Sequence, residues 1–240
     1  PAGLPQSAGS KSNMAQVYFP PLKGTAGEAR ALKTVLPRAK AFTRGQATED
    51  AIKQLHSPGI LHVATHGFFL RDQEIRLVGA RDLIVDTVQS VGPSNQPIEN
   101  PLLRSGLALA GVNLRLGRAD QGDDGVLTAL EPAGLDLWGT KLVVLSACDT
   151  GVGEVKNGEG VFGLRRALAL AGSETQVMSL WPVSDLGARD LMIEYYKALD
   201  RGEGRGDGLR RVQLEMLKRK GRRHPVYWAS FIQSGEWANL

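Results

Sequence analysis

Two side chains in this sequence could together form an activated nucleophile. Cys148 is the single cysteine of the 240-residue chain, and His66 precedes it by 82 residues. An imidazole beside a thiol can take its proton or hold it as a thiolate–imidazolium pair, which is a strong nucleophile near neutral pH. At this point the pairing is a hypothesis, because a lone cysteine is often a small buried apolar residue and a strand-end histidine is often part of the core.

Both residues follow stretches that predict buried β-strands. Residues 59–65 read Gly-Ile-Leu-His-Val-Ala-Thr and lead into His66-Gly67. Residues 141–147 read Lys-Leu-Val-Val-Leu-Ser-Ala, a continuous apolar run typical of a central parallel strand that is covered on both faces. Because the carboxyl ends of parallel strands meet at one edge of a sheet, we expect His66 and Cys148 to lie close together there.

The backbone next to these residues predicts an oxyanion hole. Gly67 leaves room for a substrate backbone to approach its amide N–H, and Thr150-Gly151 lets the chain turn sharply after Cys148. We therefore expect the N–H groups of Gly67 and Cys148 to stabilise a developing oxyanion.

The remaining elements predict an α/β fold. Apolar residues recur with helical spacing in four segments: 27–35, 161–171, 185–199 and 207–219. Short strands are expected in five others: 16–19, 39–43, 106–110, 176–181 and 228–233. Strands that alternate with helices are typical of a parallel sheet with helices on both faces.

Composition and charge exclude several classes of protein. The chain is 42% hydrophobic and 22% charged, which is enough apolar material for a core and too much for a disordered chain. Its net charge of +4 does not by itself imply nucleic acid. One cysteine excludes an intrachain disulfide framework and multi-cysteine zinc sites, and it fits a reducing, cytoplasmic location. No apolar run approaches the length of about 18 residues that a membrane span needs.

The sequence divides into a short tail and one domain. Residues 1–14 are rich in Pro, Gly, Ser and Lys without periodicity, so we interpret them as a linker or tail and residues 15–240 as one domain. Pro1 is not an initiator methionine, and no signal-peptide pattern follows it. We expect the chain to be a part or a processed product of a longer protein.

Three other motifs have structural interpretations. Gly158–Gly163 matches G-x-G-x-x-G, but a ten-residue loop separates it from the preceding strand, whereas a dinucleotide site needs these glycines directly after the strand. His62 and His66 lack the glutamate of H-E-x-x-H and would lie about 13 Å apart on a strand, so we expect no metal and a core role for His62. Residues 201–223 hold nine basic and three acidic side chains, typical of a solvated helix face; docking of an acidic partner or nucleic acid stays an alternative.

Longer motifs resemble the CHAT family, caspase-like peptidases often found beside tetratricopeptide repeats. The similarity runs in order from about residue 25 to residue 235. Its main segments are Ile60–Gly67, Asp124–Thr128, Leu145–Gly151, Ser179–Asp185 and Pro225–Phe231.

The resemblance implies a caspase-like three-layer α/β/α sandwich with a mostly parallel central sheet, and a regulated cysteine endopeptidase with a His/Cys dyad. His66 matches the family's catalytic histidine, Cys148 its nucleophile, and the amides of Gly67 and Cys148 its oxyanion donors. No cofactor is implied. The implied partners are a protein substrate and an upstream regulatory region, of tetratricopeptide type, or a sensor protein. Relatives act in bacterial defence and programmed cell death, some by cutting gasdermin-like pore formers.

The sequence predicts the substrate-binding residues less closely than the catalytic ones. Related separases carry a Trp-x-Val-x-Asp segment followed by further acids that help to hold an arginine before the cleaved bond. Here Trp181–Asp185 is followed by no further acid until Asp190. Asp185 and Asp149 are the substrate-binding candidates, with a helix cap and a solvated loop carboxylate as their respective alternatives. The alternative function for the chain is a catalytically inactive CHAT-like module that binds protein partners.

Overall fold

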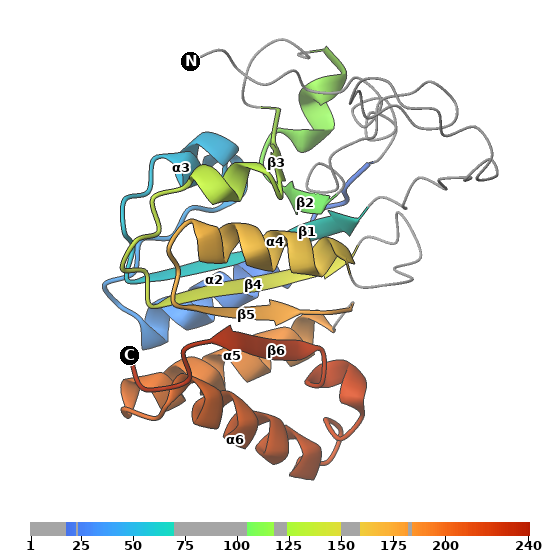
Figure 1. Ribbon diagram of the computed structural model, residues 1–240. Helices are drawn as coiled ribbons and strands as arrows, with labels where there is room; N and C mark the ends of the chain where they lie inside the picture. Colours follow the sequence, from blue (N-terminus) through green and yellow to red (C-terminus); the bar gives the residue numbers. More distant parts are fainter. Residues whose placement is uncertain (1–17, 23, 70–104, 118–123, 150–158, 182–183) are drawn as a thin grey trace, which may run out of the picture.

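The strand with the most apolar sequence lies in the middle of the sheet in this computed structural model (Figure 1). β4 (Leu142–Asp149) pairs in parallel with β1 (Ile60–Phe69) on one side and with β5 (Thr175–Ser179) on the other. The first four side chains of β4 are at most 3% exposed, as expected for a strand covered on both faces. The structure describes residues 18–22, 24–69, 105–117, 124–149, 159–181 and 184–240.

Antiparallel strands complete both sides of this parallel centre. β2 (Ser105–Ala108) pairs with β1, and β3 (Val126–Thr128) pairs with β2. β6 (Phe231–Gly235) pairs with β5 on the other side. The six-stranded sheet therefore has the order β3-β2-β1-β4-β5-β6.

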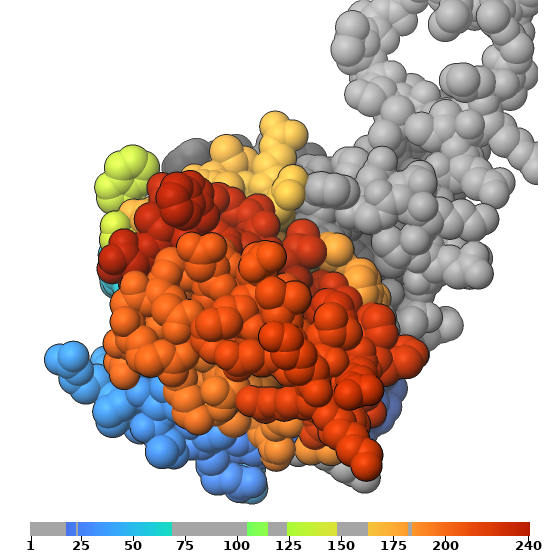
Figure 2. Space-filling model, turned by 90° about the horizontal axis from the view of Figure 1, so that it is seen from below, coloured from blue at the N-terminus to red at the C-terminus, as the bar shows by residue number. Residues whose placement is uncertain are grey.

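Helices cover both faces of the sheet. α4 (Glu159–Leu170) packs on one face through Leu164 and Leu168. α2 (Thr25–Val35), α5 (Asp185–Asp200) and α6 (Arg205–Lys218) share an apolar core with the other face. Figure 2 shows the molecule from below, where the orange helices α5 and α6 occupy the centre. The predicted three-layer α/β/α sandwich with a mostly parallel centre is confirmed.

Apolar spacing explains why α5 packs on the sheet with one side. The buried residues of α5 recur every three or four positions, which places them on one face of a helix. Those that belong to the apolar core are Ala188, Leu191, Met192, Tyr195, Tyr196 and Leu199.

A glycine ends α4. Gly172 has a φ of +103°, and a Cβ there would lie 2.9 Å from the Cα of Trp138. Only glycine fits this left-handed, closely packed position, so the helix ends there.

The other described elements are short. They are η1 (Arg44–Gln46), α3 (Glu49–Lys53), η3 (Val112–Gly117), η4 (Glu131–Gly134) and η5 (Pro225–Tyr227). No helix in the described parts of the chain is both long enough and apolar enough to cross a bilayer.

Some predicted boundaries were wrong. Residues 39–43 form no strand and lead into η1, and Tyr18 and Phe19 have no regular structure. β1 and β4 extend beyond their predicted ends, so that His66 and Cys148 lie inside strands rather than after them. Pairing with β2 extends β1, because His66–Phe69 are matched with Ser105–Ala108. β6 begins at Phe231 rather than at residue 228. The tail 1–14, Thr150-Gly151 and Gly158 lie outside the described residues.

Candidate active site

His66 and Cys148 occupy opposite positions on adjacent parallel strands. In the register of β1 and β4, the Cα of His66 is matched with that of Cys148, and the Cα of Gly67 with that of Asp149. Neighbouring strands are about 4.8 Å apart, and matched positions share one face of a pleated sheet. The structure therefore brings the backbones of these four predicted site residues together at the carboxyl ends of two central strands.

The side chains of Cys148 and Asp149 lie outside the described part of the structure. Their assignments as nucleophile and as pocket carboxylate therefore stay predictions. Gly67 is buried and is matched with Leu107 of β2 on its other side. Its backbone is thus held between two neighbouring strands.

The imidazole of His66 is held by an N-terminal segment. Its Nε2 lies 2.6 Å from the carbonyl oxygen of Pro20, and its ring centroid lies 5.8 Å from that of Phe19. Phe19 is 3% exposed and also packs on Phe68 of β1. Residues 18–22 therefore cross the end of β1 and contact the predicted catalytic histidine.

The contact with Pro20 decides which nitrogen of His66 carries the proton. A carbonyl oxygen can only accept a hydrogen bond, so Nε2 of His66 must donate it. In the neutral ring, Nδ1 then keeps its lone pair and can act as a base. The backbone carbonyl of Pro20 thus fixes the tautomer and orientation of the imidazole, as a buried carboxylate does in a Ser-His-Asp triad.

Asp185 lies at the start of α5 and contacts α2. Its Oδ2 accepts a hydrogen bond of 3.0 Å from the backbone N–H of Gly24, immediately before the first turn of α2. A Cβ on Gly24 would lie 2.3 Å from the Cβ of Asp185, so glycine allows this close approach. The carboxylate of Asp185 thus stabilises the amino end of α2, where backbone N–H groups lack helical partners.

Asp185 also lines a small pocket near the carboxyl ends of β1 and β4. The other walls include Glu28 of α2, Ala188 of α5 and Ser146 of β4. Ser146 stands two residues before Cys148, so the two positions share one face of the strand. The candidate specificity residue therefore lies near the predicted nucleophile's position and has a structural hydrogen bond as well.

A buried polar network lies deeper on this face. Both ring nitrogens of His62 are hydrogen-bonded. Nδ1 lies 2.9 Å from the Tyr196 hydroxyl, and Nε2 lies 3.2 Å from Oε1 of Glu28. Burial raises the pKa of Tyr196 well above its usual value, so the hydroxyl remains protonated. The side chain of His62 is 15% exposed and has a structural role, because its hydrogen bonds join β1, α2 and α5.

Metal binding has little support from these residues. In the described ranges, no three His, Cys, Asp or Glu side chains are grouped as ligands for one ion. Both nitrogens of His62 are already hydrogen-bonded, and Nε2 of His66 donates to Pro20.

A three-layer α/β sandwich with these histidine and cysteine positions on neighbouring strands belongs to the caspase-like class of folds. The family model described as "CHAT domain" matches residues 2–236, which is nearly the whole chain. The chain therefore belongs to the CHAT family, which is related to the caspase-like cysteine peptidases.

Two mammalian proteins show weaker similarity. Tetratricopeptide repeat protein 28 from Homo sapiens is 31% identical over 115 residues, which cover 48% of this chain and 5% of that protein. The protein of the same name from Mus musculus matches with the same identity and coverage. The chain thus spans only a small part of the length of these relatives.

Proposed function

We propose that this protein is a cysteine endopeptidase in which His66 activates Cys148. The observation that carries the proposal is the register of β1 with β4, which matches His66 with Cys148 at the carboxyl ends of the strands. Membership of the CHAT family and the hydrogen bond from His66 to Pro20 support it.

In the proposed mechanism, Nδ1 of His66 accepts the proton of the Cys148 thiol. The thiolate adds to the carbonyl carbon of the scissile peptide bond, while the amides of Gly67 and Cys148 donate to the resulting oxyanion. His66 then returns the proton to the leaving amine, and the thioester forms. Water, activated by the same imidazole, hydrolyses the thioester and regenerates the thiol. Pro20 keeps Nε2–H paired throughout, which stabilises the imidazolium that forms.

We expect Cys148→Ala and His66→Ala to lower cleavage of a peptide library by roughly 10³-fold or more, because a dyad works as a unit. The measurement is the initial rate of peptide cleavage, followed by mass spectrometry. His56→Ala is the matched control, since the side chain of His56 is 80% exposed and pairs with Asp136 at the opposite end of β1. Equal cleavage by the wild type and Cys148→Ala would contradict the proposal and favour a non-catalytic, partner-binding module.

The same library tests the substrate pocket. Asp185 and Asp149 are proposed to favour a basic residue before the cleaved bond, because carboxylates pair with Arg and Lys side chains. Asp185→Asn keeps an oxygen that can accept from Gly24 N–H, so a lost preference in this variant would report on charge rather than on folding.

The proposed biological setting follows from the family. The substrate is a protein, with gasdermin-like pore formers as candidates, and the setting is cytoplasmic, in bacterial defence or programmed cell death. A tetratricopeptide-type region or a sensor protein is the proposed regulator, supported by the similarity to two tetratricopeptide repeat proteins.

A further inference from the structure

The side chain of Asn113 is hydrogen-bonded to the segment that contacts His66. Its Nδ2 donates to the carbonyl oxygen of Phe19 at 2.8 Å, and its Oδ1 accepts from the N–H of Phe19 at 3.0 Å. The amide of Asn113 thus pairs with both backbone polar groups of Phe19, as a neighbouring strand would.

Asn113 is in turn fixed by the corner that joins β2 to η3. The residue before it, Val112, is 6% exposed and packs with Phe19, Phe68 and Val126. Gly125 lies against this corner with a φ of +75°, and a Cβ there would lie 2.4 Å from the backbone nitrogen of Val112. Close packing of Gly125 therefore holds the start of η3, and with it Asn113, against β2 and β3.

These contacts form a continuous path to the imidazole. Asn113 pairs with Phe19, Phe19 packs on the His66 ring, and the next residue, Pro20, accepts the His66 Nε2–H. We propose that Asn113 is a positioning residue that holds Pro20 on His66 and thereby keeps Nδ1 available as the base. This role rests on the proposed function, because it concerns the same histidine.

Without Asn113, the backbone of Phe19 would have to find other partners and the Pro20 carbonyl would lose its fixed position. The His66 ring could then rotate or change tautomer, and fewer molecules would have Nδ1 ready to accept the thiol proton. Glu28 and Asp185, the carboxylates that line the pocket under this edge, stay unchanged in the variants below. They cannot account for a difference between those variants.

The single cysteine allows a test that needs no substrate. Iodoacetamide reacts with thiolates, so the alkylation rate between pH 5.5 and 9.5 reports the thiolate fraction of Cys148 alone. An isolated thiol has a pKa of about 8.5. In a working dyad we expect the wild type to react roughly 10-fold faster than His66→Ala at pH 6.5, and at a similar rate at pH 9.5, where both thiols are ionised.

We expect Asn113→Ala to react about 3- to 10-fold more slowly than the wild type at pH 6.5 and to converge with it at pH 9.5. Leu114→Ala is the control, because Leu114 is the next residue on η3 and is 68% exposed. Thermal melting checks that each variant is folded. If Asn113→Ala is not folded, Asn113→Asp replaces it, because that variant keeps the side-chain acceptor and loses the donor.

The outcomes separate the two proposals. If the wild type and His66→Ala react alike at every pH, the dyad itself is contradicted. If those two differ but Asn113→Ala follows the wild type, the positioning role of Asn113 is overturned and the dyad stands. If Asn113→Ala is alkylated more slowly than the wild type by the same factor at pH 6.5 and at pH 9.5, the change reflects altered access to the thiol. This result would also overturn the positioning role.

Discussion

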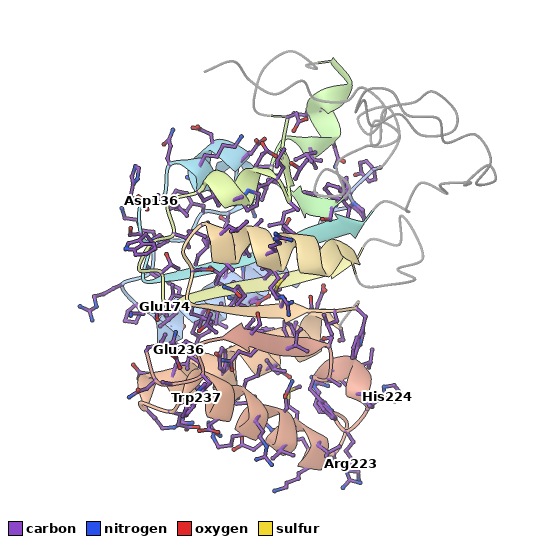
Figure 3. The ribbon with its side chains drawn as sticks, in the orientation of Figure 1. Asp136, Glu174, Arg223, His224, Glu236 and Trp237 are labelled. Carbon is purple, nitrogen blue, oxygen red and sulfur yellow. The ribbon has the colours of Figure 1, made fainter. Side chains whose placement is uncertain are left out.

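Arg205 shows how one side chain can join several elements at the edge opposite the candidate site. It is the first residue of α6 and only 3% exposed. Its guanidinium donates to the carbonyl of Lys141 before β4, to the hydroxyl of Thr175 in β5, and to the carbonyls of Ala238 and Asn239. Figure 3 shows this edge, where Glu174, Glu236 and Trp237 are labelled.

Replacement of Arg205 should therefore be costly. We expect Arg205→Ala to lower the free energy of unfolding by about 3 kcal/mol, because several buried acceptors lose their donor. In thermal melting this corresponds to a decrease in Tm of roughly 6–12 °C for a domain of this size. Arg210→Ala on the exposed side of the same helix is the control. A similar Tm for the two variants would show that the contacts of Arg205 contribute little.

At the scale of elements, the close approach of α2 to α5 depends on Gly24. The structure leaves no space for a side chain there, since a Cβ would lie 2.3 Å from that of Asp185. Gly27, one turn further along α2, has only the Cδ of Arg189 near, at 3.9 Å. The same substitution should therefore have opposite effects at the two positions.

We expect Gly24→Ala to destabilise the protein by about 1–2 kcal/mol, because α2 must move away from α5 and the bond to Asp185 is lost. Gly27→Ala should stabilise it by about 0.5 kcal/mol, since alanine favours helix. Denaturation by urea measures both. Equal effects would contradict the proposed contact between α2 and Asp185.

Elements with a strong local pattern could be predicted from sequence, and long-range pairings could not. The apolar run of β4 and the spacing in α5 determine those elements locally, and the parallel-strand rule then predicts that residues 66 and 148 meet. The extension of β1 depends on its pairing with β2, which no local pattern shows. The link from Pro20 to His66 spans 46 residues and uses a backbone carbonyl, which leaves no signal in the sequence.

At the scale of the whole molecule, a buried carboxyl makes stability depend on pH. Glu49 of α3 is 1% exposed and contacts Lys53, which also lies 2.9 Å from Oε1 of Glu131. Burial raises the pKa of Glu49 to about 8, against the opposing hydrogen bond from Lys53. Hydrogen bonds from Glu49, Lys53 and Thr128 outweigh burial at Glu131 and lower its pKa.

The sign of the effect follows from proton uptake. Between pH 4.5 and 8 the folded protein keeps the Glu49 proton that the unfolded chain releases, so stability falls as the pH rises through this range. We expect the wild type to lose about 3 kcal/mol more stability between pH 5 and pH 8 than Glu49→Gln, whose side chain does not titrate. Stability against urea at several pH values measures this. Asp50→Asn controls for the loss of one negative charge, and parallel curves for Glu49→Gln and the wild type would contradict the expectation.

The two-sided pairing of β1 has a consequence for how such a molecule could be switched on and off. The main chain at His66 is bonded into a parallel ladder with β4 and an antiparallel ladder with β2. Moving it would break hydrogen bonds in both ladders together. A conformational switch in this protein would therefore leave the histidine's main chain in place and act on the orientation of its ring.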